Sequence, residues 1–243
     1  MISRREQQLG YVLHSRPYRE SSLLVEYFSR EQGRVALLVK GARGRKARGG
    51  SLAALLQLFN PLSCSWVGRN ELKTLTSCEV VDYRPTLGSS RLYTGMYLNE
   101  LLVRLLHHED PHQLLFDEYS RALDELRACD DVEPLLRQFE FSLLEELGYG
   151  FEPNVDSHSG DPVDPEGWYY YHPDQGMVPV LDSSSQRLES FRGAELLQLA
   201  ERDFSAGGRS CAKKLMRQAL SHHLGDKPLK SRVLFQRLHS MDV

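Results

Sequence analysis

Eight residues near the N-terminus, from Gly44 to Ser51, have the sequence G-R-K-A-R-G-G-S and come close to a nucleotide-binding motif. A Walker loop has the pattern G-x-x-x-x-G-K-[ST], in which backbone N–H groups and the lysine ammonium hold the phosphates. Gly50 stands here where that lysine must be, and no alternating strand and helix pattern surrounds the segment. The β- and γ-phosphates would lose their main positive partner, so the sequence argues against binding of a nucleoside triphosphate.

The same segment belongs to a long run of positive charge. Between Gln32 and Asn70 the chain has seven basic side chains and no acidic one. Residues 1–82 contain 13 Lys and Arg against 7 Asp and Glu, although the whole chain of 243 residues has a formal net charge of -3. A solvated surface normally mixes the two signs. The clustering therefore favours a surface that faces an anion, with a merely solvated basic loop as the alternative.

A nucleic acid is an anion that suits such a surface. Lysine and arginine neutralise phosphates without a fixed geometry, and glycines let a loop follow an irregular backbone. Exposed aromatic rings would add stacking on bases, but the sequence does not decide which rings are exposed. The candidate phosphate-binding residues are Arg16, Arg19, Arg34, Lys40, Arg43, Arg45, Lys46, Arg48 and Lys73. The aromatic candidates are Tyr11, Tyr18, Tyr27, Phe28, Phe59 and Trp66.

A second basic block covers residues 205–243, with 8 Lys and Arg against 2 Asp and Glu. Lys213, Lys214 and Arg217 lie within one predicted helical turn, beside apolar residues such as Leu215 and Met216. Positive charge beside an apolar groove suits an acidic peptide with a hydrophobic end at least as well as a nucleic acid. The alternative is a helix that packs on the core and has a cationic outer face.

The sequence contains no recognisable catalytic or metal-binding constellation. The two His-His pairs, at 107–108 and 222–223, direct their rings to different sides of a helix, and there is no H-E-x-x-H or G-x-S-x-G motif. Four cysteines, at positions 64, 78, 129 and 211, lack zinc-site or redox-motif spacing. We interpret them as scattered free thiols at half-buried positions. We therefore expect a protein that is not an enzyme and has no cofactor and no bound metal.

Five short segments with the composition and alternation of β-strands hold the basic groups of the first 82 residues. The long connection after the third segment favours a five-stranded OB-fold barrel, with an SH3-like barrel as the alternative. The predicted strands span 9–18, 22–29, 35–41, 56–69 and 72–83.

After Pro85 the apolar residues recur with a helical period. The predicted helices span 89–108, 111–129, 133–150, 190–201 with Ser190 as a cap, 210–225 and 229–240. The sequence thus predicts an α+β fold: an OB-fold domain over 1–82, followed by an α-helical domain over 83–243 with a small irregular loop and hairpin insertion at about 150–185. No apolar stretch is long enough to span a bilayer and no signal peptide is recognisable, so we expect a cytoplasmic protein.

Several segments together resemble one family across nearly the whole chain. They are "VLHSRPYRESSLLVEYFSREQGRVALLVKGARGRK", "LQLFNPL", "YLNELLVRLL", "LRQFEFSLLEELGYG" and "KPLKSRVLFQRL", in this order. The chain resembles the RecO family of bacterial recombination-mediator proteins, in its gamma-proteobacterial form. The resemblance implies binding of single- and double-stranded DNA, annealing of complementary strands, and partnership with the single-stranded-DNA-binding protein (SSB) and RecR. Members help load RecA onto SSB-coated DNA, and we expect a monomer associated with the nucleoid.

The resemblance also assigns residues. Arg34, Lys40, Arg43 and Lys73 fall on basic positions of the family's barrel, whereas Arg45, Lys46 and Arg48 lie in its variable loop, where only charge is expected to matter. The SSB tail is acidic and ends in an aromatic residue, and the family's helical domain binds it. The residues expected to receive it here are Arg137, Leu136, Phe141 and Leu144. Many relatives hold zinc with two C-x-x-C pairs in the stretch matching 155–180, which contains no cysteine here, so we expect no structural zinc.

The resulting hypothesis needs charge neutralisation and no nucleotide hydrolysis. SSB's tail would recruit the protein through its helical domain, while the basic barrel screens phosphate repulsion between two strands. Two other classes stay open: a protein-interaction scaffold of the repair machinery that does not anneal DNA, and a nuclease or NTPase that uses the Gly/Arg loop.

Overall fold

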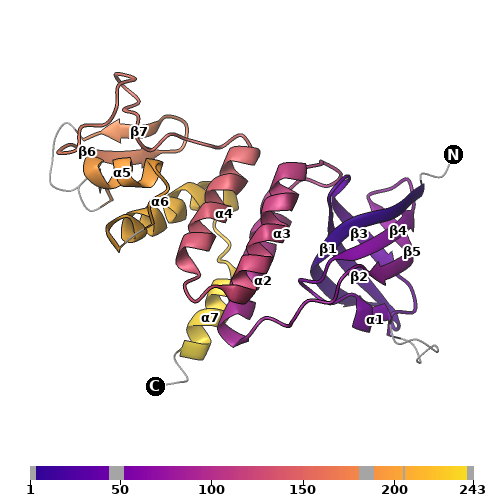
Figure 1. Ribbon diagram of the computed structural model, residues 1–243. Helices are drawn as coiled ribbons and strands as arrows, with labels where there is room; N and C mark the ends of the chain where they lie inside the picture. The colour runs from indigo at the N-terminus through magenta and orange to yellow at the C-terminus, as the bar shows by residue number, and fades with distance from the viewer. Residues whose placement is uncertain (1–3, 44–51, 181–188, 205, 240–243) are drawn as a thin grey trace. The chain divides into compact units, whose positions relative to one another are not determined.

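The computed structural model describes residues 4–43, 52–180, 189–204 and 206–239 (Figure 1). The chain forms two compact units: Met1–Cys129 together with Pro228–Val243, and Asp130–Lys227. The predicted boundary at residue 82 falls inside the first of these units and stays a prediction of domain organisation. No described helix is long and apolar enough to cross a membrane.

The first unit begins with a closed barrel. Its strands are β1 (Arg4–Tyr18), β2 (Ser22–Ser29), β3 (Gly33–Val39), β4 (Leu62–Val67) and β5 (Leu72–Val80), with the short helix α1 (Leu52–Leu55) between β3 and β4. Their order around the barrel is β1-β2-β3-β5-β4, and only the β3–β5 pair is parallel. This confirms the prediction of a five-stranded OB-fold barrel followed by helices.

Alternation of apolar residues builds the interior of the barrel. Val35, Leu37 and Val39 of β3 are buried, and the residues between them are partly exposed, because successive side chains of a strand point to opposite faces. Tyr27 is fully buried, and its hydroxyl donates to the backbone carbonyl of Leu62 at 2.8 Å. A buried hydroxyl without a partner is costly, so this bond helps to fix β2 against β4.

Two strand predictions differ from the structure. β1 begins at Arg4 rather than at residue 9, because its first half pairs with β4 and its second half with β2. Residues Arg4 to Gln7 are polar and exposed, so they show no apolar alternation. The predicted fourth strand is much shorter than expected, since residues 56–61 before β4 form a bent connection.

Helices α2 (Ser89–Leu105) and α3 (Gln113–Ala128) cover one side of the barrel, and α7 (Lys230–His239) packs against α2 (Figure 1). Rings of the barrel meet rings of α3: the centroids of Tyr11 and Phe116 are 5.5 Å apart, and those of Phe28 and Phe116 are 5.4 Å apart. Asn99 of α2 is buried and donates to the carbonyl of Leu13 in β1 at 2.9 Å. Barrel and helices therefore share one core.

The second unit contains α4 (Glu133–Glu146), β6 (Trp168–His172), β7 (Gly176–Pro179), β8 (Phe191–Arg192), α5 (Gly193–Ala200) and α6 (Ala206–Leu224). The strands form a small sheet of order β7-β6-β8. Ser190 does not cap a helix as predicted, because β8 follows it and α5 begins only at Gly193. Instead the N–H of Arg192 donates to the Glu195 carboxylate at 3.3 Å.

Candidate nucleic-acid interface and peptide site

Four predicted cations gather at one end of the barrel, which we call the cationic end: Arg16, Arg19, Lys40 and Arg43. Strand register explains the grouping, since Arg16 pairs with Leu24 of β2, which pairs with Leu38 of β3. The β1–β2 turn that carries Arg19 and the residues after β3 that carry Lys40 and Arg43 therefore meet there. All four side chains are exposed.

Arg43 orders this end of the barrel. Its backbone N–H donates to the carbonyl of Ser21 at 2.9 Å, and its guanidinium donates to the carbonyls of Arg19 at 3.1 Å and Glu20 at 2.6 Å. Gly41 has a φ of +68°, a left-handed conformation that glycine adopts without strain, and it lets the chain turn back toward β2. Arg43 thus holds the β1–β2 turn through both its backbone N–H and its side chain.

Charge at the cationic end is not neutralised within the described residues. None of the four cations makes an ion pair with a described carboxylate, although Glu20 lies in the same turn. The guanidinium of Arg19 lies 5.2 Å from the ring centroid of Tyr18. Arg45, Lys46 and Arg48, together with the whole Walker-like segment, lie outside the described residues.

Arg34 and Lys73 lie elsewhere and have partners. The Arg34 guanidinium donates to Glu26 at 2.9 Å, to the carbonyl of Leu106 at 2.8 Å and to that of Val103. These carbonyls belong to the C-terminal end of α2, where a cation is favourable. Lys73 is buried and pairs with Glu109. To bind a phosphate either side chain would have to leave these contacts, so their assignment to DNA stays a prediction.

Most of the candidate stacking rings belong to the core. Tyr11, Tyr27, Phe28, Phe59 and Trp66 are buried, and of the six only Tyr18 is partly exposed. Tyr27 and Trp66 meet inside the barrel with centroids 5.9 Å apart. Tyr83 is 76% exposed in the segment after β5, and the aromatic candidates do not include it because they stop at the predicted domain boundary, residue 82.

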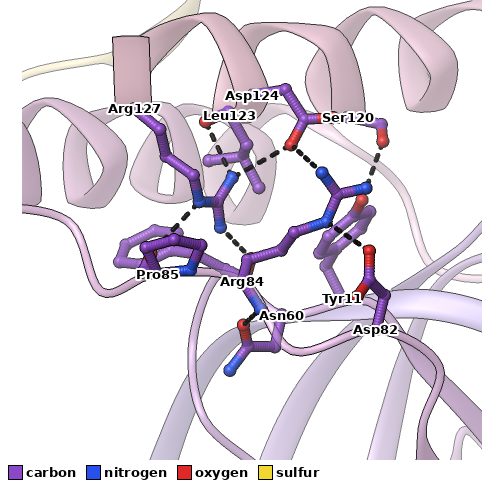
Figure 2. Close-up of polar contacts among 10 residues, drawn as sticks. Tyr11, Asn60, Asp82, Arg84, Pro85, Ser120, Leu123, Asp124 and Arg127 are labelled. Atoms are coloured by element: carbon purple, nitrogen blue, oxygen red, sulfur yellow. Dashed lines mark hydrogen bonds and ion pairs between the residues drawn. The ribbon is translucent and has the colours of Figure 1, made fainter.

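A network of polar contacts fixes the β5–α2 connection to the barrel and α3 (Figure 2). Arg84 pairs with Asp82 at 2.9 Å and with Asp124 of α3 at 3.1 Å. Arg127 donates to the carbonyls of Phe59 at 2.7 Å and Leu123 at 2.8 Å, and burial lowers the pKa of its guanidinium. These arginines serve structure, whereas Arg16 and Arg19 at the cationic end are exposed and make no ion pair with a described carboxylate.

Arg137 and Glu140 form a buried ion pair on α4. Arg137 Nη1 lies 3.1 Å from Glu140 Oε2, and the side chains are only 8% and 1% exposed. Arg137 Nε is buried and has no hydrogen-bond partner among the described residues. A buried N–H without a partner is rare and costly, so it marks a position where a further acceptor would stabilise the protein.

The three apolar residues predicted with Arg137 differ in their surroundings. Leu136 is partly exposed, whereas Phe141 and Leu144 are buried. Phe141 packs against Phe151, with centroids 6.0 Å apart, and the Arg202 guanidinium lies 4.1 Å from its ring centroid. Of the four residues predicted to bind the peptide, Arg137 has a buried N–H without a partner among the described residues, and Leu136 is the only apolar one that is partly exposed.

Within the second unit, the cations of the second basic block mostly contact other residues of that unit. Arg209 pairs with Asp131 at 2.6 Å, and Lys213 pairs with Glu133 at 2.8 Å. Lys214 donates to the carbonyl of Ser190 at 2.8 Å. Arg217, in contrast, is exposed and makes no ion pair with a described residue. These contacts favour the alternative, a helix that packs on the core, and binding of a peptide or nucleic acid by this block stays a prediction.

Hydrogen bonds order the loop before β6. The Asp156 carboxylate accepts from the N–H groups of His158 at 2.8 Å and Ser159 at 3.3 Å. Asp164 donates its N–H to the Tyr169 hydroxyl at 2.8 Å. Within the described residues no three His, Cys, Asp or Glu side chains are grouped to hold a metal ion.

Comparison with known proteins agrees with this architecture. The family model described as Recombination protein O N terminal matches residues 1–84, and that described as Recombination protein O C terminal matches residues 89–233. The DNA repair protein RecO of Pseudomonas paraeruginosa is 47% identical over 229 residues, which cover 94% of both chains. The RecO proteins of Methylococcus capsulatus and Haemophilus influenzae are each 44% identical, over 93% and 95% of this chain and 91% and 95% of their own.

The barrel and the helices that follow it define an OB-fold protein with four exposed cations at one barrel end that make no ion pair with a described residue. The family models cover the barrel and the helical part in turn, and the relatives match almost end to end. The chain belongs to the RecO family of DNA repair proteins.

Proposed function

We propose that this protein binds single- and double-stranded DNA, anneals complementary strands and, with RecR and SSB, helps to load RecA onto SSB-coated DNA. The observation that carries the proposal is the cationic end of the barrel, where Arg16, Arg19, Lys40 and Arg43 are exposed and make no ion pair with a described residue. Membership of a DNA repair family supports it. In this proposal the protein is a cytoplasmic, nucleoid-associated monomer and not an enzyme.

Annealing by such a surface is an electrostatic effect. Two strands repel one another through their phosphates, and cations between them reduce that repulsion while the bases stay free to pair. If the cationic end and the basic segment after it bind about six phosphates, log K for single-stranded DNA falls with log salt concentration at a slope of about -4. The protein makes and breaks no covalent bond in this process.

SSB would be bound by the helical part through its acidic tail. Arg137 supplies a cation, its Nε lacks an acceptor in the described structure, and Leu136, the preceding residue of α4, is a partly exposed apolar side chain. A carboxylate is the acceptor that a guanidinium binds most strongly. The tail's carboxylate would pair with Arg137 and share with Glu140 the neutralisation of its charge.

Replacement of Arg16, Arg19 and Lys40 by alanine tests the DNA-binding surface. Arg43 is left in place because it orders the turn. We expect weaker binding of a labelled single strand, a salt slope shallower by about 2, since each lost phosphate contact contributes about 0.7, and slower annealing of complementary oligonucleotides.

The control removes three exposed cations elsewhere, with Arg217, Lys230 and Arg232 changed to alanine. It changes the net charge of the protein by the same amount. Equal losses in both triple variants would mean that overall charge, and not the cationic end, governs DNA binding. An unchanged salt slope in the first variant would also rule out the proposed surface.

A further inference from the structure

Two of the four cysteines face one another across the β4–β5 ladder. Cys64 of β4 and Cys78 of β5 are direct partners in the antiparallel register, between the pairs Leu62–Val80 and Ser65–Ser77. Both are buried, as is Cys211, whereas the sequence had suggested scattered half-buried thiols. Their separation by 14 residues in the chain gave no redox-motif signal.

The hydrogen-bond pattern shows which kind of pair they form. Val81 donates its N–H to the carbonyl of Pro61 at 3.0 Å, so these two residues form a hydrogen-bonded pair. Hydrogen-bonded and non-hydrogen-bonded pairs alternate along an antiparallel ladder, and no register shift intervenes before residues 64 and 78. Cys64 and Cys78 therefore form a non-hydrogen-bonded pair, in which the Cα atoms lie about 4.5 Å apart.

This geometry suits a disulfide. A disulfide requires Cα atoms about 4.4–6.8 Å apart and Cβ atoms that approach one another. Ser63 and Glu79 next to the cysteines are less buried, so alternation directs both thiols into the barrel, where they are hydrogen-bonded to one another. The bond can form without a change of strand register.

We propose that Cys64 and Cys78 form a reversible disulfide inside the barrel when the protein meets a small hydroperoxide. Cys78 is the less buried of the two residues, with 8% of the residue exposed against 0% for Cys64. It is therefore the sulfur that an oxidant reaches first.

The chemistry of the two thiols divides their roles. The hydrogen bond from Cys64 lowers the pKa of Cys78, while the same bond and burial raise the pKa of Cys64. The Cys78 thiolate attacks a peroxide oxygen, the O–O bond breaks, and a sulfenic acid and one water or alcohol result. The Cys64 sulfur then attacks Cys78, the S–O bond breaks, and water leaves. Two thiols are oxidised to one disulfide and one hydroperoxide is reduced.

The other cysteines do not share this arrangement. Cys211 is buried in α6, where burial raises its pKa to about 12. Cys129 is partly exposed immediately after α3. Neither has a cysteine opposite it in a strand ladder among the described elements.

The test uses the full chain with Cys129 and Cys211 changed to serine. The protein is treated with hydrogen peroxide, its free thiols are alkylated under denaturing conditions, and it is digested with trypsin without reduction. Cleavage predicts that peptide 49–69 carries Cys64 and peptide 74–91 carries Cys78. We expect these two peptides linked and lighter by two hydrogens, and separated after treatment with dithiothreitol.

The same variant with Cys78→Ser is the matched control and should give no linked peptide. The proposal is wrong if both thiols stay alkylatable at a peroxide concentration that oxidises Cys129 in the unchanged protein. It is also wrong if Cys78 accumulates as a sulfinic acid without the link. Both readouts come from the variant that keeps Cys64 and Cys78, so a control that fails to fold does not affect the decision.

Discussion

Arg34 and Arg16 lie on strands of the same barrel but have opposite surroundings. Arg34 contacts one carboxylate and two helix-end carbonyls, whereas Arg16 is exposed and makes no ion pair with a described residue. Hydrogen bonds to charged groups are worth about 1.5–3 kcal/mol each. At the scale of the residue, an arginine whose hydrogen bonds are made within the protein is structural, whereas an arginine without such partners is available to bind a phosphate. The sequence predicted both alike, because Val103 and Leu106 are about 70 residues away from Arg34.

The Arg137–Glu140 pair allows a test of the proposed SSB-tail site. Removal of Arg137 alone would leave Glu140 buried without its cation, which typically costs about 3–5 kcal/mol. The double change Arg137→Met with Glu140→Gln removes both charges. We expect it to weaken binding of an acidic, aromatic-ended tail peptide by about tenfold or more, because a charged hydrogen bond is lost, and to leave affinity for naked DNA unchanged.

Fluorescence anisotropy of labelled peptide and labelled DNA gives both affinities. Arg217→Ala, an exposed cation of the same unit, serves as control. A peptide affinity that does not change in the double variant would exclude Arg137 from the site. A parallel loss of DNA affinity would contradict separate sites for peptide and DNA.

At the scale of the element, alternation and helical period predicted most strands and helices. Apolar residues recur with these periods because one face of each strand or helix is buried, as in β3. These signals fail for the polar beginning of β1, which is held by pairing with β4, and for the start of α5, which is set by β8. The cationic end was predictable as a cluster of charge, whereas the burial of Lys73 and Phe141 depends on contacts made by distant segments.

Glu100 of α2 holds the beginning of α7. Its carboxylate accepts from the N–H groups of Lys230 and Ser231, each at 2.9 Å, and from the Ser231 hydroxyl at 2.7 Å. Burial alone would raise its pKa, but the hydrogen bonds from Ser231 and Lys230 outweigh burial, so the pKa of Glu100 is lowered. This stabilisation is present above the ordinary carboxyl pKa of about 4.3 and is lost as pH falls through the lower folded value.

We therefore expect Glu100→Gln to lower the Tm at about pH 6 and to differ less from the unchanged protein at about pH 3. Thermal melts at both pH values measure the difference. Glu201→Gln, at an exposed position, should change Tm little at either pH. A Tm difference that does not depend on pH would mean that the ionised Glu100 carboxylate does not hold α7.

At the scale of the whole molecule, the barrel is not self-sufficient. Tyr11 and Phe28 are buried against Phe116 and Tyr119 of α3. Arg127 of α3 donates to the carbonyl of Phe59, which lies between α1 and β4. A fragment of residues 1–84, the range of the N-terminal family model, would expose these rings. We expect it to melt without cooperativity or to aggregate, whereas the full chain melts cooperatively. A fragment with a sharp, reversible circular dichroism transition at the full-length Tm would contradict this expectation.

The tie between Glu100 and Ser231 also has a consequence for biosynthesis. The two residues are 131 positions apart, and the whole second unit is encoded between them. At about 5–20 residues per second, a ribosome needs about 7–26 seconds to reach Ser231 after it has added Glu100. During that interval the nascent barrel and its helices lack their last helix, so the apolar surface of α2 that α7 will cover is open to chaperones.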